Sequence, residues 1–156
     1  MVDQKTDFPA LLQFLIKFYE EKIPFNKVFN LQITYLKEDN ICIKIDMKDE
    51  LIGNCEYRML HGGVISSVLD LTGGAIASMG ILKKLEGRPL EEITKRLYKI
   101  GTIDLRVDFL RPGRGNYFLS TGSIMRMGNK VVVIRTSLHN DQKVLIAVGT
   151  GTYMLG

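Results

Sequence analysis

The sequence has few of the residues that build metal centres and disulfide frameworks. Its 156 residues include two cysteines, two histidines and no tryptophan. Cys42 and Cys55 do not form a CxxC pair, so we expect free thiols in a reducing compartment. Since His61 and His139 are the only histidines, we expect no zinc site, and we predict that the protein uses no metal and no other cofactor.

A strong excess of charge of one sign is also absent. The formal net charge is +4, and the chain has 24% charged and 46% apolar residues, which is an ordinary globular composition. A mildly basic protein suits an anionic ligand, but no block of lysines and arginines predicts a nucleic-acid partner. The length favours a single domain over residues 1–156.

The chain also lacks the signals of export and of a membrane span. The start, MVDQKTDFPALLQF, has an acidic residue before its apolar run and no small-residue cleavage site. Residues 64–82 approach the length of a membrane span, but Asp70, several serines and several glycines interrupt them. We therefore predict a cytoplasmic protein that does not insert into a membrane.

The first third of the chain predicts a helix and a hairpin. Residues 8–23 repeat apolar positions at helical spacing, with Asp7 as the N-cap and Pro24 as the stop, so residues 1–24 form an N-terminal helical segment. Residues 31–47 contain two β-rich runs, which predict a hairpin that turns at Glu38, Asp39 and Asn40.

A long apolar helix and a helical insertion follow. Residues 64–82 are apolar or small except for Asp70. The insertion, residues 83–98, has Pro89 near its helix start, and a solvated face is predicted from two pairs spaced four residues apart, Glu91/Lys95 and Glu92/Arg96.

The last third of the chain predicts four strands. In TIDLRVDFL, residues 102–110, the periodicity is two, so one face carries Ile103, Leu105, Val107 and Phe109, and the other carries Asp104, Arg106 and Asp108. Three more strands are predicted at residues 117–127, 130–139 and 143–154. A helix that is apolar all round has to be buried, so we predict an α+β protein in which an antiparallel sheet wraps around the long helix.

Asp70 is the only charge in the middle of that helix. An unpaired buried carboxylate costs several kcal/mol, so this one is paired, neutralised or functional. In the structural alternative, Ser66 or Ser67 is its local partner.

Two motifs resemble those of one enzyme family. HGG at residues 61–63 is followed by Asp70 nine positions after His61, and VDFLRPG follows at residues 107–113. This combination resembles the hotdog-fold thioesterases of the PaaI-type branch of the 4-hydroxybenzoyl-CoA thioesterase superfamily. The insertion and the run GTIDLRVDFLRPGRG are more similar to a bacterial acyl-CoA thioesterase subgroup than to the aryl-CoA members.

The resemblance implies roles for individual residues. The catalytic carboxylate of the family falls on Asp70, and its carbonyl-polarising backbone N–H falls on Gly62. The family often has an amide six residues before the histidine, where this chain has Cys55. Either the loop has one extra residue and Asn54 takes the role, or this contact is missing. The accessory serine or threonine of the family is not placed, because the insertion breaks the alignment.

The chemistry of these residues agrees with thioester hydrolysis. A helix N-terminus exposes unpaired N–H groups, and Gly62 and Gly63 let a carbonyl approach them closely. Asp70 is the base or the nucleophile. Eight residues of one helix separate Gly62 from Asp70 by roughly 12 Å. We therefore expect the site to form between two chains with facing helices, in a homodimer or a dimer of dimers.

Four further residues have open roles. His61 either carries a proton or orients the loop before the helix. Arg111 and Arg114, with Arg106 nearby and Lys130 in a turn, either hold coenzyme A phosphates or form a solvated strand end.

We therefore predict an acyl-CoA thioesterase that hydrolyses medium- or long-chain substrates. The alternatives are an aryl-CoA thioesterase, of phenylacetyl- or hydroxybenzoyl-CoA type, and a non-catalytic acyl-CoA-binding protein. A hotdog dehydratase is disfavoured, because the proline-bearing motif around its histidine is absent.

Overall fold

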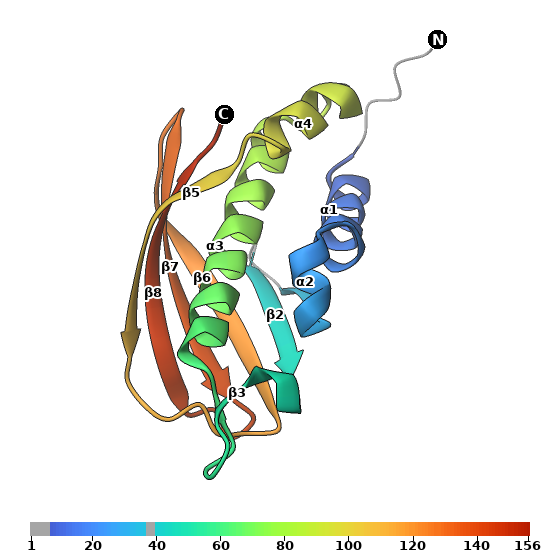
Figure 1. Cartoon of the computed structure of the whole chain (residues 1–156). Helices are drawn as coiled ribbons and strands as arrows, with labels where there is room; N and C mark the ends of the chain where they lie inside the picture. Colours follow the sequence, from blue (N-terminus) through green and yellow to red (C-terminus); the bar gives the residue numbers. More distant parts are fainter. Residues whose placement is uncertain (1–6, 37–39) are drawn as a thin grey trace.

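The architecture is a six-stranded antiparallel sheet that curves around one long helix (Figure 1). The structure is a computed structural model that describes residues 7–36 and 40–156. Its strand order is β1-β2-β6-β7-β8-β5, so β1 and β5 form the edges. The strands are β1 Gln32–Leu36, β2 Asn40–Asp46, β5 Gly101–Phe109, β6 Tyr117–Met127, β7 Val131–Asn140 and β8 Leu145–Met154, and a separate two-stranded sheet holds β3 Ile52–Asn54 and β4 Met59–Leu60.

The long helix α3, Gly62–Lys84, lies against the concave face of the sheet. Its C-terminal half is also covered by α1, Phe8–Lys17, and by α4, Leu90–Leu97, as Figure 1 shows. By length and composition α3 would pass for a membrane span, but most of it is buried inside the fold. The prediction of an α+β protein with a sheet wrapped around a central apolar helix is confirmed.

The N-terminal segment differs from the single helix that we predicted. Asp7 is the N-cap, since its side chain accepts a 3.0 Å hydrogen bond from the Ala10 N–H. The α-helix ends at Lys17, however, and a π-helical turn, Phe18–Lys22, follows. Ile23 is extended, so this helical run stops directly before Pro24, as predicted, and Pro24 then begins α2, Pro24–Phe29. The physical reason is that proline has no N–H to place and a φ already suited to the first helical position.

The predicted hairpin and insertion are largely as expected. β1 and β2 pair antiparallel, although the turn residues Glu38 and Asp39 lie outside the described residues. In α4 the Lys95 ammonium lies 2.7 Å from the Glu91 carboxylate, as predicted. The Glu92/Arg96 pair is wrong, because Glu92 has its ion-pair partner one turn earlier, at 4.0 Å from Arg88.

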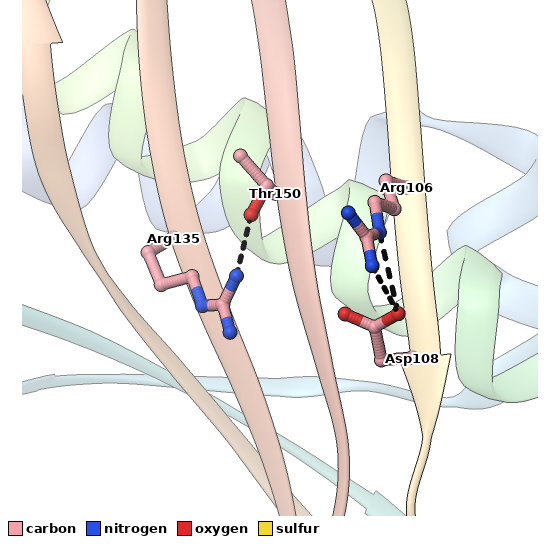
Figure 2. A network of polar contacts seen from close by, with 4 residues as sticks. All are labelled: Arg106, Asp108, Arg135 and Thr150. Carbon is pink, nitrogen blue, oxygen red and sulfur yellow. Dashed lines mark hydrogen bonds and ion pairs between the residues drawn. The ribbon is translucent and has the colours of Figure 1, made fainter.

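The edge strand β5 has two different faces. Leu105, Val107 and Phe109 lie on the face toward α3, while Arg106 and Asp108 form an ion pair of 3.1 Å on the opposite face (Figure 2). Arg135 also lies there and donates to the Thr150 hydroxyl at 2.7 Å. The alternation fails only at Ile103, where a bulge interrupts the pairing.

Candidate active site

His61 starts α3 by capping its first turn. Its backbone is extended, and its Nδ1 accepts a 2.8 Å hydrogen bond from the Gly63 N–H. The Gly62 N–H has no hydrogen-bond partner among residues 7–36 and 40–156. Since the first N–H groups of a helix point outward along its axis, Gly62 presents a free donor at the positive end of the helix dipole.

The chain around this donor is held by backbone contacts. The His61 N–H donates to the Leu51 carbonyl at 2.9 Å, and the Leu60 N–H donates to the Gly113 carbonyl at 2.9 Å. A Cβ on Gly53 would lie 2.7 Å from the His61 Cα, so the backbone of β3 passes directly against His61. These contacts fix the position of the Gly62 N–H, as a site for a developing oxyanion requires.

Asp70 lies two turns further along α3 and is half-buried, not part of the core. Its carboxylate accepts a 2.9 Å hydrogen bond from the Thr102 hydroxyl at the start of β5. The structural alternative of a Ser66 or Ser67 partner is wrong, because Ser66 donates to the Gly62 carbonyl and Ser67 to the Gly63 carbonyl. One side of the carboxylate is therefore positioned by a hydroxyl while the group stays open to a substrate.

Tyr153 fixes the backbone beneath Asp70. Its hydroxyl donates to the Asp70 carbonyl at 3.1 Å, and its ring occupies the space left by the missing side chains of Gly73 and Gly151. Burial, with the nearby Asp70 carboxylate as a further cause, raises the pKa of Tyr153 well above its usual range. The phenol therefore stays protonated and neutral beside the carboxylate.

A pocket of about 140 Å³ opens beside Asp70. Its walls come from four parts of the chain that are distant in sequence, and it is lined by Tyr19, Ile23, Asp70, Leu71, Gly74, Ile100, Gly101, Thr102 and Tyr153. Apart from Asp70 and Thr102, the lining is apolar or aromatic, so the pocket suits an apolar group placed next to a carboxylate.

One chain does not bring Gly62 and Asp70 together. Both lie on α3, Gly62–Lys84, so eight residues of regular helix separate them by about 12 Å. The free N–H and the carboxylate therefore cannot contact one thioester group within one chain, as we expected from their spacing.

Asn54 lies at the end of β3 and is exposed. Its side-chain oxygen accepts a 3.1 Å hydrogen bond from the Tyr57 N–H, so it closes the turn between β3 and β4. This contact gives Asn54 a structural role within its own loop, beside any role toward a substrate.

The basic residues separate into two groups. Arg111 donates to the Leu145 carbonyl at 3.1 Å, and Arg114 stacks 5.2 Å from the centre of the Tyr57 ring. Lys130 lies at the other end of the sheet, because Val131 pairs with Met154 whereas His139 pairs with Leu145. At about 3.3 Å per residue, this separation is on the order of 30 Å, so one chain does not bring Lys130 to the arginines.

Three features of the site have no clear signal in the sequence. Thr102 is 32 residues from Asp70 and reaches it only through the path of β5, and Tyr19 and Tyr153 reach the pocket from opposite ends of the chain.

In the described parts of the chain, no three histidine, cysteine, aspartate or glutamate side chains are grouped as a metal would require. Cys42 and Cys55 are free thiols, as predicted, and burial raises the pKa of Cys42.

Comparison with known proteins identifies the class of this fold and site. The family model of the thioesterase superfamily matches residues 57–147. A medium/long-chain acyl-CoA thioesterase of Salmonella typhimurium, YigI, is 42% identical over 134 residues, which cover 86% of each chain. A crystal structure from Shewanella oneidensis, described as related to the thioesterase superfamily, is 43% identical, with a TM-score of 0.90 over 97% of this chain and 100% of that one.

The chain therefore belongs to the thioesterase superfamily, as the resemblance of its motifs predicted. The Escherichia coli PaaI protein of the phenylacetic acid degradation operon shares the fold, with a TM-score of 0.71 over 94% of each chain at 15% identity. The hotdog architecture predicted from the motifs is thus confirmed.

Proposed function

We propose that this protein hydrolyses medium- or long-chain acyl-CoA to a free acid and coenzyme A. The observation that carries the proposal is the pair of groups on α3, an uncapped Gly62 N–H and a half-buried Asp70 carboxylate held by Thr102. The substrate class is taken from the relatives named as medium/long-chain acyl-CoA thioesterases. A cytoplasmic location remains a prediction from the sequence.

Each group has one task in this reaction. The Gly62 N–H donates to the thioester oxygen and stabilises the negative charge that develops there. Asp70 acts in one of two ways: it takes a proton from the attacking water, or it attacks the carbonyl carbon itself and forms an anhydride that water then opens. In both routes the carbon–sulfur bond breaks, and the thiolate of coenzyme A leaves. Thr102 orients the carboxylate by its hydrogen bond.

The two groups meet when two chains pair around a two-fold axis. The edge strand β5 supports this assembly, since its outer backbone groups have no neighbouring strand and its apolar side chains Ile103 and Phe109 are 58% and 55% exposed. Phe109 also lies against Gly62, because a Cβ on Gly62 would be 3.5 Å from its ring. A partner that covers β5 would therefore reach the start of α3.

Mixed dimers test the shared site. Asp70→Ala and Gly62→Pro each inactivate one half of the site, the second because proline has no N–H to donate. If the site is shared, mixing the two inactive proteins under conditions of subunit exchange restores one working site per mixed dimer. Verified exchange without recovery of thiol release, or a fully active monomer in sedimentation, would exclude the shared site.

The coenzyme A phosphates are assigned to the arginine end of the sheet. Arg111 and Arg114 are exposed beside the Arg-Pro-Gly loop that holds the start of α3, and Lys130 joins them only if another subunit supplies it. Each lost contact costs about 1 kcal/mol of binding free energy, so Arg111→Ala with Arg114→Ala is expected to raise KM for acyl-CoA about thirtyfold. Hydrolysis of a short thioester without the nucleotide should be unchanged. Equal losses on both substrates would indicate a structural role.

A further inference from the structure

The pocket beside Asp70 is too small for the acyl chains of the proposed substrates. Its volume is about 140 Å³, close to that of a cavity that binds one benzene molecule, about 150 Å³. About six carbons therefore fit between Asp70 and the far wall. Medium and long acyl chains need more room than this open-sided pocket holds, so the rest of the chain either leaves through the open side or requires one wall to move.

Tyr19 is a large aromatic wall of the pocket whose tip makes one side-chain hydrogen bond. The side chain is 7% exposed, and its hydroxyl lies 3.1 Å from the Ser78 hydroxyl. Ser78 uses its own hydrogen on the Gly74 carbonyl at 2.9 Å, so Tyr19 is the donor of this bond. Burial raises the pKa of Tyr19 to about 12, which keeps that proton in place at neutral pH.

The backbone of Tyr19 is held more firmly than its side chain. The Tyr19 carbonyl accepts a 2.9 Å hydrogen bond from the buried Asn26 side chain, and the Glu20 carboxylate next to it accepts a 2.6 Å bond from the Ile33 N–H. The residue lies in the π-helical turn Phe18–Lys22, a type of turn that is frequent at functional sites. A rotation of the Tyr19 side chain therefore breaks one side-chain hydrogen bond and changes the packing of a buried ring, but it leaves the backbone contacts of the turn intact.

A group of aromatic rings lies behind Tyr19. Phe18, which does not line the pocket, lies edge-on to the Tyr19 ring at 5.9 Å. Phe14 and Tyr98 extend this aromatic group at 6.3 Å and 5.7 Å from Phe18, and Phe14 and Phe18 are only partly buried. The group lies where α1 and the end of α4 meet α3, so these rings can cover further methylene groups.

We infer that Tyr19 determines chain-length specificity: its ring closes the pocket behind about six carbons, and longer acyl chains are accepted only when the ring turns away from Ser78. This inference rests on the proposed thioesterase activity and assigns the acyl part of the substrate to the chain that supplies Asp70. The displaced ring and the aromatic group behind it then line the continuation of the site.

The test compares hydrolysis rates across acyl-CoA substrates from about four to about sixteen carbons. In Tyr19→Leu the wall is smaller and the hydrogen bond is lost, so kcat/KM for chains beyond the pocket should rise about tenfold relative to the short chains. Tyr19→Phe keeps the wall and removes only the hydrogen bond to Ser78, so the same ratio should rise about threefold. Ser78→Ala also keeps the wall, but it removes the bond from Ser78 to the Gly74 carbonyl as well, and the ratio should rise by a similar factor. Ser123→Ala, an exposed serine on β6, is the matched control and should leave the ratio unchanged.

The outcomes separate the inference from the proposed function. A change by one common factor at every chain length, in variants that melt as folded proteins, would overturn the role of Tyr19 and leave the thioesterase intact. A wild-type protein that releases thiol from none of these substrates would overturn the proposed function and the role of Tyr19 with it. If Tyr19→Leu fails to fold, Tyr19→Phe and Ser78→Ala decide the question.

Discussion

The two halves of α3 have different surroundings, although they belong to one continuous helix. From Gly62 to Leu71 only three residues are buried, whereas from Thr72 to Leu82 every residue except Gly74 is buried. The sheet lies against both halves, but α1 and α4 cover only the second one (Figure 1). The first half is thus left with one open side.

This difference separates catalysis from stability along one helix. The open half carries the free Gly62 N–H and the Asp70 carboxylate, neither of which is needed to fill the core. The covered half carries the small residues that let Tyr153 and Tyr19 pack closely. Substitutions in the first half should therefore reduce activity, and substitutions in the second half should reduce stability.

The largest effect is expected from Asp70→Asn. The amide keeps the shape of the carboxylate and can still accept from Thr102, but it cannot take a proton. Thiol release should fall by on the order of 10²-fold or more, while the melting temperature is maintained or rises, since a charge kept for function is removed. Asp104→Asn, an exposed position on the outer side of β5, is the control. A folded Asp70→Asn protein with the wild-type rate would contradict the role of Asp70.

Gly73→Ala should mainly reduce stability, whereas Asp70→Asn should mainly reduce activity. A Cβ at this position would overlap the phenol of Tyr153, which is 1% exposed and also packs against Gly151. Overpacking of this kind costs about 1–3 kcal/mol of unfolding free energy, measurable by denaturant titration. The fraction that remains folded should lose less activity than Asp70→Asn does, because the Asp70 carboxylate is kept. Wild-type stability in this variant would show that the covered half is less tightly packed than the contacts indicate.

Gly62→Ala is the matched substitution in the open half. Its Cβ would meet the Phe109 ring at 3.5 Å, an ordinary contact, so stability should be unchanged or higher by about 0.5–1 kcal/mol, as alanine favours the helix. The methyl group crowds the approach of a carbonyl to the Gly62 N–H, so kcat/KM should fall on the order of tenfold. Loss of stability without loss of activity would reverse the assignment of the two halves.

The smallest effect is expected from Thr102→Val. This change keeps the side-chain volume and removes the 2.9 Å hydrogen bond to Asp70. We expect kcat to fall about fivefold with little change in KM or in melting temperature, because Thr102 is exposed. Thr150→Val, which removes the hydroxyl that binds Arg135 on the outer face in Figure 2, is the control and should be neutral for catalysis. Equal effects of the two variants would mean that Thr102 has no special relation to Asp70.

Local sequence patterns predicted a structural feature best where that feature depends only on residues close together in the chain. The alternation in β5, the Asp7 cap and the Glu91–Lys95 pair follow from periodicity and short spacing, and all three are present. The break before Pro24 was predicted, but the helix that begins at Pro24 was not, because a proline after a helix and a proline at a helix start have the same local pattern. The Thr102 partner of Asp70 was not predicted, because composition marks residues 64–82 as apolar but does not say which side of the helix has a neighbour.

By itself the sequence determined the family, the long apolar helix inside an antiparallel sheet, and the spacing that keeps Gly62 and Asp70 apart in one chain, because motifs and periodicity are properties of neighbouring residues. Only the tertiary structure decided that Thr102 and not a serine of α3 holds Asp70, that Lys130 lies far from Arg111, and that Tyr19 lines the pocket beside Asp70. These contacts join residues that are distant along the chain. Their geometry depends on the strand register, a β-bulge and a π-helical turn. Such contacts depend on how whole elements pack, and no local pattern of residues specifies that packing.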